Sequence, residues 1–252
     1  MQGKHCVFSR QAKTLESKGY PVELKVVCFK WQRDRRGYQL PSVCDYSWKH
    51  VQTLKSMVQR NLYIPHEFIC ITDDPNHPED IKTIPLWDKC RHLGGCYNRL
   101  YAFSEDMRSI IGERFVMIDL DCVITGDITS LFDTNDDFKI NGYFFGDFDQ
   151  YYNGGLVLMN AGARKQVWDD FDPIRSPNQV ANTDYVIGSD QAWIRIRLGK
   201  GEKRFTEEEG VYNFIRLKNQ RLPDDAKIVF FAGKRDPSTC LDTPWVREHW
   251  RV

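Results

Sequence analysis

The chain lacks an excess of charge of either sign, and it lacks the long apolar runs of membrane proteins. Its 252 residues include 35 basic and 35 acidic side chains, so no overall field attracts nucleic acid or an anionic membrane surface. No apolar stretch approaches bilayer-spanning length, and the first residues do not form the apolar core of a signal peptide. The composition predicts a globular cytoplasmic protein with no transmembrane segment and argues against a nucleic-acid partner.

Paired cysteine motifs are also absent. The chain has eight cysteines, but no two of them form a Cys-x-x-Cys motif. That motif is typical of zinc knuckles and redox sites. Three cysteines lie within or beside apolar runs, where a free thiol packs like a small hydrophobic group: Cys28, Cys70 and Cys122. A zinc site at Cys90, His92 and Cys96 is the alternative, and we expect reduced, structural cysteines.

Strand-like and helix-like segments alternate in the first half of the chain. Expected strands span residues 22–31, 68–72, 81–86 and 115–119, and expected helices span residues 45–60 and 97–111. This order is typical of parallel βαβ units. The second half predicts a helical turn at 128–132, strands at 142–146, 156–159 and 227–231, helices at 163–171 and 190–198, and a charged, turn-rich segment at 199–224.

The segment Phe-Val-Met-Ile-Asp-Leu-Asp at 115–121 carries the strongest functional signal. Side chains alternate across a strand, so Asp119 and Asp121 share one side if the extended backbone continues. Two like charges cannot stay unpaired in a buried strand, so both should face water or a cation at its end. Ligands of open α/β sheets bind at that end, and carboxylates favour Mg²⁺ or Mn²⁺. The alternative is a pair of solvated turn residues or a cap of the next short helix.

Three further segments are candidates for binding. Asn153-Gly154-Gly155 allows close backbone approach or positive φ, with the Asn153 amide available to a sugar hydroxyl, although Asn-Gly is also an ordinary turn. Asp190-Gln191 opens a predicted helix, where an acid suits the positive end of the helix dipole. Gly233-Lys234 follows the last strand and could contact a phosphate, and a charged surface loop is the alternative.

Taken in order, these segments resemble the GT-A-fold nucleotide-diphospho-sugar transferases, most closely their retaining, glycogenin-like and bacterial galactosyltransferase-like branch. The matching segments are Tyr97–Leu100, Phe115–Asp121, Asn153–Gly155, Asp190–Gln191 and Phe231–Gly233. The resemblance implies an α/β, Rossmann-like GT-A fold with a mixed, mostly parallel sheet flanked by helices. It implies a single domain over 1–252, with a nucleotide-binding half at 1–125 and an acceptor half at 126–252.

The same resemblance implies a hexosyltransferase. It would move a hexose from a nucleotide-diphosphate sugar, expected to be a UDP-sugar, to a hydroxyl of a glycan, lipid or protein acceptor. Mn²⁺ or Mg²⁺ would bind to Asp119 and Asp121 as a DXD motif. The implied catalytic and acceptor-side residues are Asn153, Asp190 and Gln191. The implied nucleotide-contacting residues are Phe29, Lys30, Asp73, Arg99, Asp119, Gly233 and Lys234.

The chain departs from the family at its closing motif, His-Phe-x-Gly-x-x-Lys-Pro, in which the His is a third metal ligand. Phe230 stands at the His position and Asp236 at the Lys position. Asp236, a water or a phosphate oxygen would then complete the metal shell, and Lys234 or Arg235 would replace the Lys.

Two other functions and the stereochemistry stay open. The chain could be a non-catalytic nucleotide-sugar-binding protein or a sugar-phosphate nucleotidyltransferase, although the latter needs a Gly-rich loop where residues 31–37 hold a single Gly. Transfer could retain or invert the sugar configuration, and inversion would need a general base, for which Asp190 is the best candidate.

Overall fold

The computed structural model describes residues 23–31, 46–90, 93–142, 144–145, 148–149, 152–181, 190–231 and 235–252. Three residues singled out from the sequence lie outside these ranges: His92, Gly233 and Lys234.

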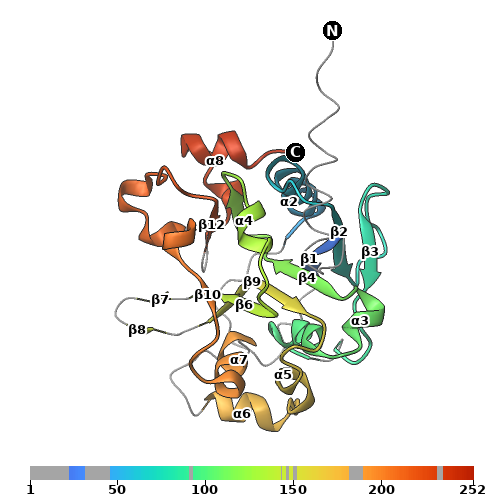
Figure 1. The fold of residues 1–252 in the computed structure, drawn as a ribbon. Coiled ribbons are helices and arrows are strands. Elements are labelled where there is room, and N and C mark those ends of the chain that lie inside the picture. Colours follow the sequence, from blue (N-terminus) through green and yellow to red (C-terminus); the bar gives the residue numbers. More distant parts are fainter. Residues whose placement is uncertain are drawn as a thin grey trace.

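A seven-stranded sheet forms the centre of the molecule (Figure 1), with strand order β10-β6-β9-β4-β1-β2-β3. Its strands are β1 (Leu24–Lys30), β2 (His66–Thr72), β3 (Lys82–Pro85), β4 (Arg114–Ile118), β6 (Phe138–Asn141), β9 (Asn153–Asn160) and β10 (Arg204–Phe205). All neighbouring pairs are parallel except those of β9, which runs antiparallel to both β4 and β6. The mixed, mostly parallel sheet predicted from the sequence is therefore confirmed.

A three-stranded sheet lies beside the main one, in the order β11-β12-β5. It consists of β5 (Cys122–Ile124), β11 (Val211–Asn213) and β12 (Ile228–Phe230). The chain passes from β4 in the large sheet to β5 in the small sheet through only three residues, 119–121. A further antiparallel pair, β7 (Phe144–Phe145) and β8 (Phe148–Asp149), forms a two-stranded ribbon.

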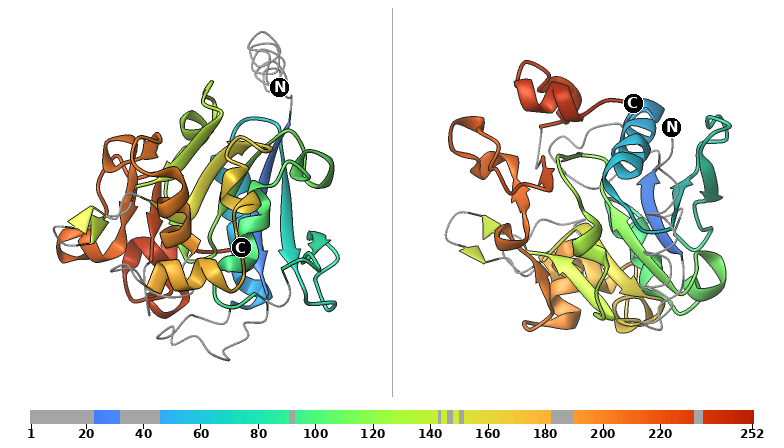
Figure 2. Two further views of the ribbon diagram at one scale, coloured as in Figure 1. Left: turned by 90° about the horizontal axis from the view of Figure 1, so that it is seen from below. Right: turned by 45° about the horizontal axis from the view of Figure 1, so that its top comes forward.

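Helices cover both faces of the main sheet, as the views in Figures 1 and 2 show. The α-helices are α2 (Trp48–Asn61), α3 (Met107–Ile110), α4 (Thr129–Phe132), α5 (Gln166–Asp169), α6 (Arg175–Ala181), α7 (Asp190–Leu198) and α8 (Pro244–His249). The 3₁₀ segments are η1 (Tyr97–Phe103), η2 (Glu207–Glu209), η3 (Phe214–Arg216), η4 (Lys218–Gln220) and η5 (Pro237–Thr239).

Strand β4 shows how the two sides of the core arise, because its side chains alternate between them. Val116 and Ile118 pack with the apolar face of α2 and with the small sheet. Phe115 and Met117 pack on the other side with η1, α5 and α7. Each fully buried large apolar side chain contributes about 1.5–3 kcal/mol, so the alternation fixes the register of β4 and the position of the acids that follow it.

Several predicted elements agree with the structure. The expected strands at 22–31, 68–72, 81–86, 115–119 and 227–231 correspond to β1, β2, β3, β4 and β12, and helix α7 has the predicted bounds. The helix at 45–60 is α2, whose N-terminus is closed by a capping box between Ser47 and His50.

Other predictions were wrong. The helix expected at 97–111 is a fully buried 3₁₀ segment followed by the short α3. It breaks at Ser104, whose hydroxyl accepts a hydrogen bond from the Asp106 amide (3.2 Å) and so competes with helical bonding. Among the described residues, the strand expected at 142–146 contains only the two-residue β7, and the longer β6 at 138–141 was not predicted. Residues 153–155 belong to β9 rather than to a separate turn.

The expectations about cysteine and membrane spans can be compared with the described part of the chain. Its six cysteines are all free thiols, and no group of three or more His, Cys, Asp or Glu side chains there is arranged to hold a metal. Within the same ranges, no helix combines the length and apolar character needed to cross a bilayer.

Candidate active site

Polar residues from several strands meet at one edge of the main sheet. Strands β4, β6 and β10 run in the same direction and end at this edge, and the antiparallel β9 begins there. The residues at these ends therefore come together although they are far apart in sequence. They are Asp119 and Asp121 after β4, Asn141 at the end of β6, Asn153 at the start of β9 and Thr206 after β10.

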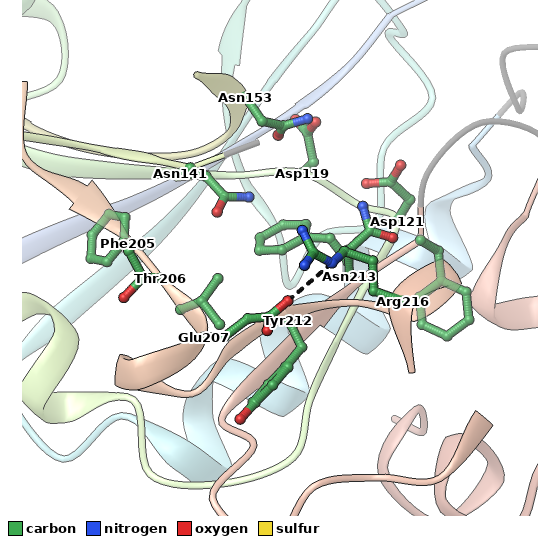
Figure 3. A pocket seen from close by; sticks show the side chains of 14 residues that line it. Asp119, Asp121, Asn141, Asn153, Phe205, Thr206, Glu207, Tyr212, Asn213 and Arg216 are labelled. Atoms are coloured by element: carbon green, nitrogen blue, oxygen red, sulfur yellow. Dashed lines mark ion pairs between the residues drawn. The ribbon is translucent and has the colours of Figure 1, made fainter. Parts of the chain in front are cut away.

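A pocket of about 580 Å³ opens at this edge (Figure 3). Its floor and walls come from both sheets, because the small sheet contributes β11 and the end of β12. The lining residues are Asp119, Asp121, Asn141, Gly142, Asn153, Phe205, Thr206, Glu207, Val211, Tyr212, Asn213, Arg216, Phe230 and Phe231. The two acids predicted to share a side therefore face one common space.

Backbone hydrogen bonds hold the two acids at the junction of the sheets. The Asp119 amide donates to the Gly155 carbonyl (2.8 Å), and the Phe231 amide donates to the Asp121 carbonyl (2.7 Å). Leu120 between them is buried with only 2% exposure and anchors the crossing in the core. These hydrogen bonds hold the backbone of both acids in place without a ligand, and so they fix the points from which the two carboxylates project.

Arg99 joins two of the predicted site residues into a buried ion-pair network. Its Nη1 donates to Asp119 Oδ1 (2.5 Å), and its Nε and Nη2 donate to the two oxygens of Asp190 (2.5 and 3.1 Å). Burial alone would lower the pKa of Arg99, but the charges of Asp119 and Asp190 outweigh it and raise the pKa above its ordinary value. The guanidinium therefore stays charged, and Asp190 is almost fully buried.

Gly154 and Gly155 allow this network to approach the backbone of β9. A Cβ on Gly154 would lie 2.5 Å from Asp190 Oδ2 and 2.9 Å from Arg99 Nη2. A Cβ on Gly155 would lie 2.7 Å from Asn153 Oδ1 and 3.2 Å from Asp119 Oδ2. Neither glycine has positive φ, so close approach, rather than an unusual backbone conformation, is what requires glycine here.

Asn153 and Gln191 also meet at the site. Asn153 Nδ2 donates to Gln191 Oε1 (3.2 Å), and Asn153 Oδ1 accepts from the Gly155 amide (2.7 Å). Helix α7 brings Asp190 and Gln191 to this position because the indole of Trp193 is buried and donates to the Val167 carbonyl (2.7 Å).

Asp121 carries the clearest electrostatic perturbation in the pocket. Burial, together with the nearby charge of Asp119, raises the pKa of Asp121 to about 8, although the charge of Arg99 acts in the opposite direction. Among the described ion pairs, Arg99 binds Asp119 and not Asp121. In the protein alone, its carboxyl therefore favours the protonated form, and a cation in the pocket would favour the ionised form.

The donor set fits a hard divalent cation. Two carboxylates face the pocket, and Mg²⁺ or Mn²⁺ accepts one or two protein carboxylates, with waters and substrate phosphates completing the shell. Among the described residues, no third His, Cys, Asp or Glu completes the set, and Phe230 lines the pocket at the position of the expected His. Asp236, suggested above as a substitute ligand, lies instead against His50, whose Nε2 is 3.1 and 3.2 Å from its two oxygens.

Four described residues expected to contact the nucleotide lie outside the pocket lining. Arg99 is buried in the ion-pair network with Asp119 and Asp190. Phe29 is buried against Trp31 and Trp87. Lys30 donates to Asp74 (2.8 Å), and Asp73 follows β2 at the same edge of the sheet. Their predicted roles stay predictions, as do those of Gly233 and Lys234, which lie outside the described residues.

Sequence reasoning missed one wall of the pocket. Asn141, Thr206, Glu207, Asn213 and Arg216 line it, yet most of them belong to the segment at 199–224 that looked merely turn-rich. In that segment, the apolar residues Phe205 and Val211 were the only sequence feature that indicated strands, and they lie in β10 and β11.

Comparison with known proteins gives the fold. No protein-family model matches the chain, and no curated protein matches its sequence. The galactosyltransferase LgtC, solved with donor and acceptor sugar analogues, matches with a TM-score of 0.53 and 14% identity over 91% of this chain and 97% of that one. The glycosyltransferase GlyE of Streptococcus pneumoniae matches with a TM-score of 0.54 and 14% identity, over 85% of this chain and 56% of that one. At such identities the likeness establishes a GT-A-type fold, as predicted.

Proposed function

We propose that the chain is a glycosyltransferase that moves a hexose from a nucleotide-diphosphate sugar, of the UDP type, to an acceptor hydroxyl. The GT-A-type fold shared with LgtC and GlyE supports this proposal. The observation that carries it is that Asp119, Asp121 and Asn153 line one pocket at the strand-end edge of the sheet.

We assign Asp119 and Asp121 as the residues that hold Mn²⁺ or Mg²⁺ together with the donor diphosphate. When bound, the cation would neutralise negative charge on the departing nucleoside diphosphate. The chain's own contribution is preorganisation, because both acids are fixed by backbone hydrogen bonds to β9 and β12. Groups that need not reorganise stabilise developing charge most effectively.

Arg99 orients Asp119, and Asp190 orients Arg99. Both Asp190 oxygens accept from the guanidinium and the side chain is almost fully buried, which makes this carboxylate a poor general base. The contact therefore favours a positioning role for Asp190 over the base that an inverting enzyme would need. Asn153 and Gln191, linked through their amides, are proposed to face the transferred sugar or the acceptor.

A non-catalytic nucleotide-sugar-binding protein is the second candidate. One observation favours it: among the described residues, the two acids have no His, Cys, Asp or Glu as a third metal-binding neighbour, and Phe230 stands at the expected His position. A weaker metal site would reduce turnover more than donor binding, because the charge to be stabilised grows in the transition state.

A thermal-shift measurement combined with a donor-hydrolysis assay tests the proposal. UDP with Mn²⁺ should raise the melting temperature of the parent protein, and Asp121→Ala should abolish that rise. Asp224→Ala, which removes an exposed acid outside the pocket, should leave it intact.

Turnover then separates the two candidates. Release of UDP from UDP-sugars in the presence of Mn²⁺ supports a transferase, whereas donor binding without release supports the binding protein. If neither UDP nor any UDP-sugar changes the melting temperature, both candidates fail.

A further inference from the structure

The pocket is rich in acid, which is unexpected for a site that binds a diphosphate. Asp119, Asp121 and Glu207 are the acidic residues of its lining, and Arg216 is the single basic residue among the described residues that line it. A nucleoside diphosphate is itself strongly anionic. A divalent cation between Asp119 and Asp121 would offset these two carboxylates, and an additional cationic group would favour the ligand further.

Arg216 lies at the end of η3 and lines the same pocket as the acid pair. Figure 3 shows its side chain pointing toward Glu207, with the guanidinium facing the same space as Asp119 and Asp121. The Arg216 Nε lies 3.3 Å from Glu207 Oε1. A guanidinium presents its N–H donors in a planar fork that matches phosphate geometry.

The backbone that carries Arg216 is firmly held. Phe214 is buried, and its ring stacks on Phe231 at the end of β12 with centroids 4.3 Å apart and an interplanar angle of 16°. Asn213 caps the 3₁₀ segment by accepting from the Ile215 amide (3.1 Å), and Leu217 on the far side of Arg216 is buried as well. The side chain of Arg216 is 44% exposed, whereas its backbone is held by the buried residues Phe214 and Leu217.

Lys234 and Arg235 are the sequence-based candidates for this role, and Lys234 lies outside the described residues. Arg235, a sequence-based candidate to replace the family Lys, is exposed and does not line the pocket. Asp236 stands at the position of the family Lys, and its carboxylate lies 3.1 Å from His50 Nε2. The cationic function expected near the closing motif therefore has a different source among the described residues.

We propose that Arg216, oriented by Glu207, is a binding residue for the diphosphate of the nucleotide-sugar donor, an inference that rests on the proposed function. Glu207 acts as a positioning residue, since its carboxylate pairs with the Nε of Arg216 at the pocket wall. This assigns the missed wall of the pocket to donor recognition, in addition to any contact with the acceptor.

Calorimetric titration with UDP and with uridine, both in the presence of Mn²⁺, tests this role. Arg216→Gln should weaken UDP binding at least about tenfold, as loss of a charge-assisted contact implies, and leave uridine binding unchanged. Arg216→Lys keeps the charge but loses the fork, so it should restore part of the affinity. Lys218→Gln, which removes a charge from a nearby exposed residue outside the pocket, should bind UDP like the parent.

The outcomes separate this inference from the proposed function. If the parent does not bind UDP, the proposed function fails. If the parent binds UDP and Arg216→Gln binds it equally well, only the role of Arg216 fails, and an effect confined to transfer onto an acidic acceptor would likewise overturn it. Unchanged melting temperatures of the variants without ligand would show that the effect is not one of folding.

Discussion

Replacing Asp121 by Asn should stabilise the protein in the absence of metal at neutral and alkaline pH. The folded state raises the pKa of this carboxyl from 3.8 to about 8, chiefly through burial and then through the charge of Asp119. Between these two values, the folded protein retains a proton that the unfolded chain releases. Stability is therefore present below about pH 4 and is lost progressively as the pH rises to about 8.

The size of the effect follows from the shift. Each pKa unit corresponds to about 1.4 kcal/mol, so a shift from 3.8 to about 8 sets an upper limit of roughly 6 kcal/mol. Asp121 is partly exposed to the pocket, and solvent screens the interaction. We therefore expect a gain of about 2 kcal/mol for Asp121→Asn at about pH 8, which is a rise of roughly 5 °C in Tm for a chain of this size.

Urea unfolding in the presence of a chelator measures this gain. The free energy of unfolding of the parent should fall relative to that of Asp121→Asn between about pH 5 and about pH 8. Asp224→Asn, at an exposed position outside the pocket, should follow the parent. Parallel pH profiles for the parent and Asp121→Asn would refute the electrostatic account of this carboxyl.

Three further perturbations follow from the same contacts. Gly154→Ala should cost about 2–3 kcal/mol in urea unfolding, because its Cβ would lie 2.5 Å from Asp190 Oδ2; a cost below about 0.5 kcal/mol would show that the network can move aside. Arg99→Gln should cost about 3–5 kcal/mol by leaving buried Asp190 without its cation, and stability equal to the parent in the same measurement would contradict the buried network. Burial alone would raise the pKa of Asp236, but hydrogen bonds from His50 and Ser238 lower it, so its stabilising contribution is present above about pH 4 and lost as the pH falls further; acid unfolding of Asp236→Asn should accordingly be less pH-dependent than that of the parent.

The sequence predicted the parts of the fold that carry a strong local signal. The run from Phe115 to Ile118 ends abruptly in acids, and its short length and β-branched residues favour a buried strand whose end is exposed. Helix α7 has apolar residues at helical spacing, and its predicted bounds agree with the structure. For the same reason, Asp119 and Asp121 could be placed together before the structure was known.

Long-range contacts could not be predicted in this way. The contact of His50 with Asp236 joins residues 186 positions apart, and neither residue has a local pattern that indicates the other. Strands β10 and β11 contain only two and three residues, too few to show a period. The wall that holds Glu207 and Arg216 therefore became visible only through the pairing of β10 with β6 and of β11 with β12.

The position of the glycines was anticipated, but not the reason for it. Asn153-Gly154-Gly155 suggested either positive φ or close approach. The choice depends on Arg99, which comes from a segment more than fifty residues earlier in the chain. A Cβ on Gly154 would lie only 2.9 Å from Arg99 Nη2, and nothing within residues 153–155 specifies that neighbour.

The binding of Mn²⁺ to the protein in the presence of UDP, followed by the electron paramagnetic resonance signal of the free ion, tests the central claim most directly. Adding the parent protein with UDP should deplete the free Mn²⁺ signal, and Asp119→Asn and Asp121→Asn should each restore most of it. If both variants remove the ion from solution as fully as the parent, these two carboxylates do not hold a cation.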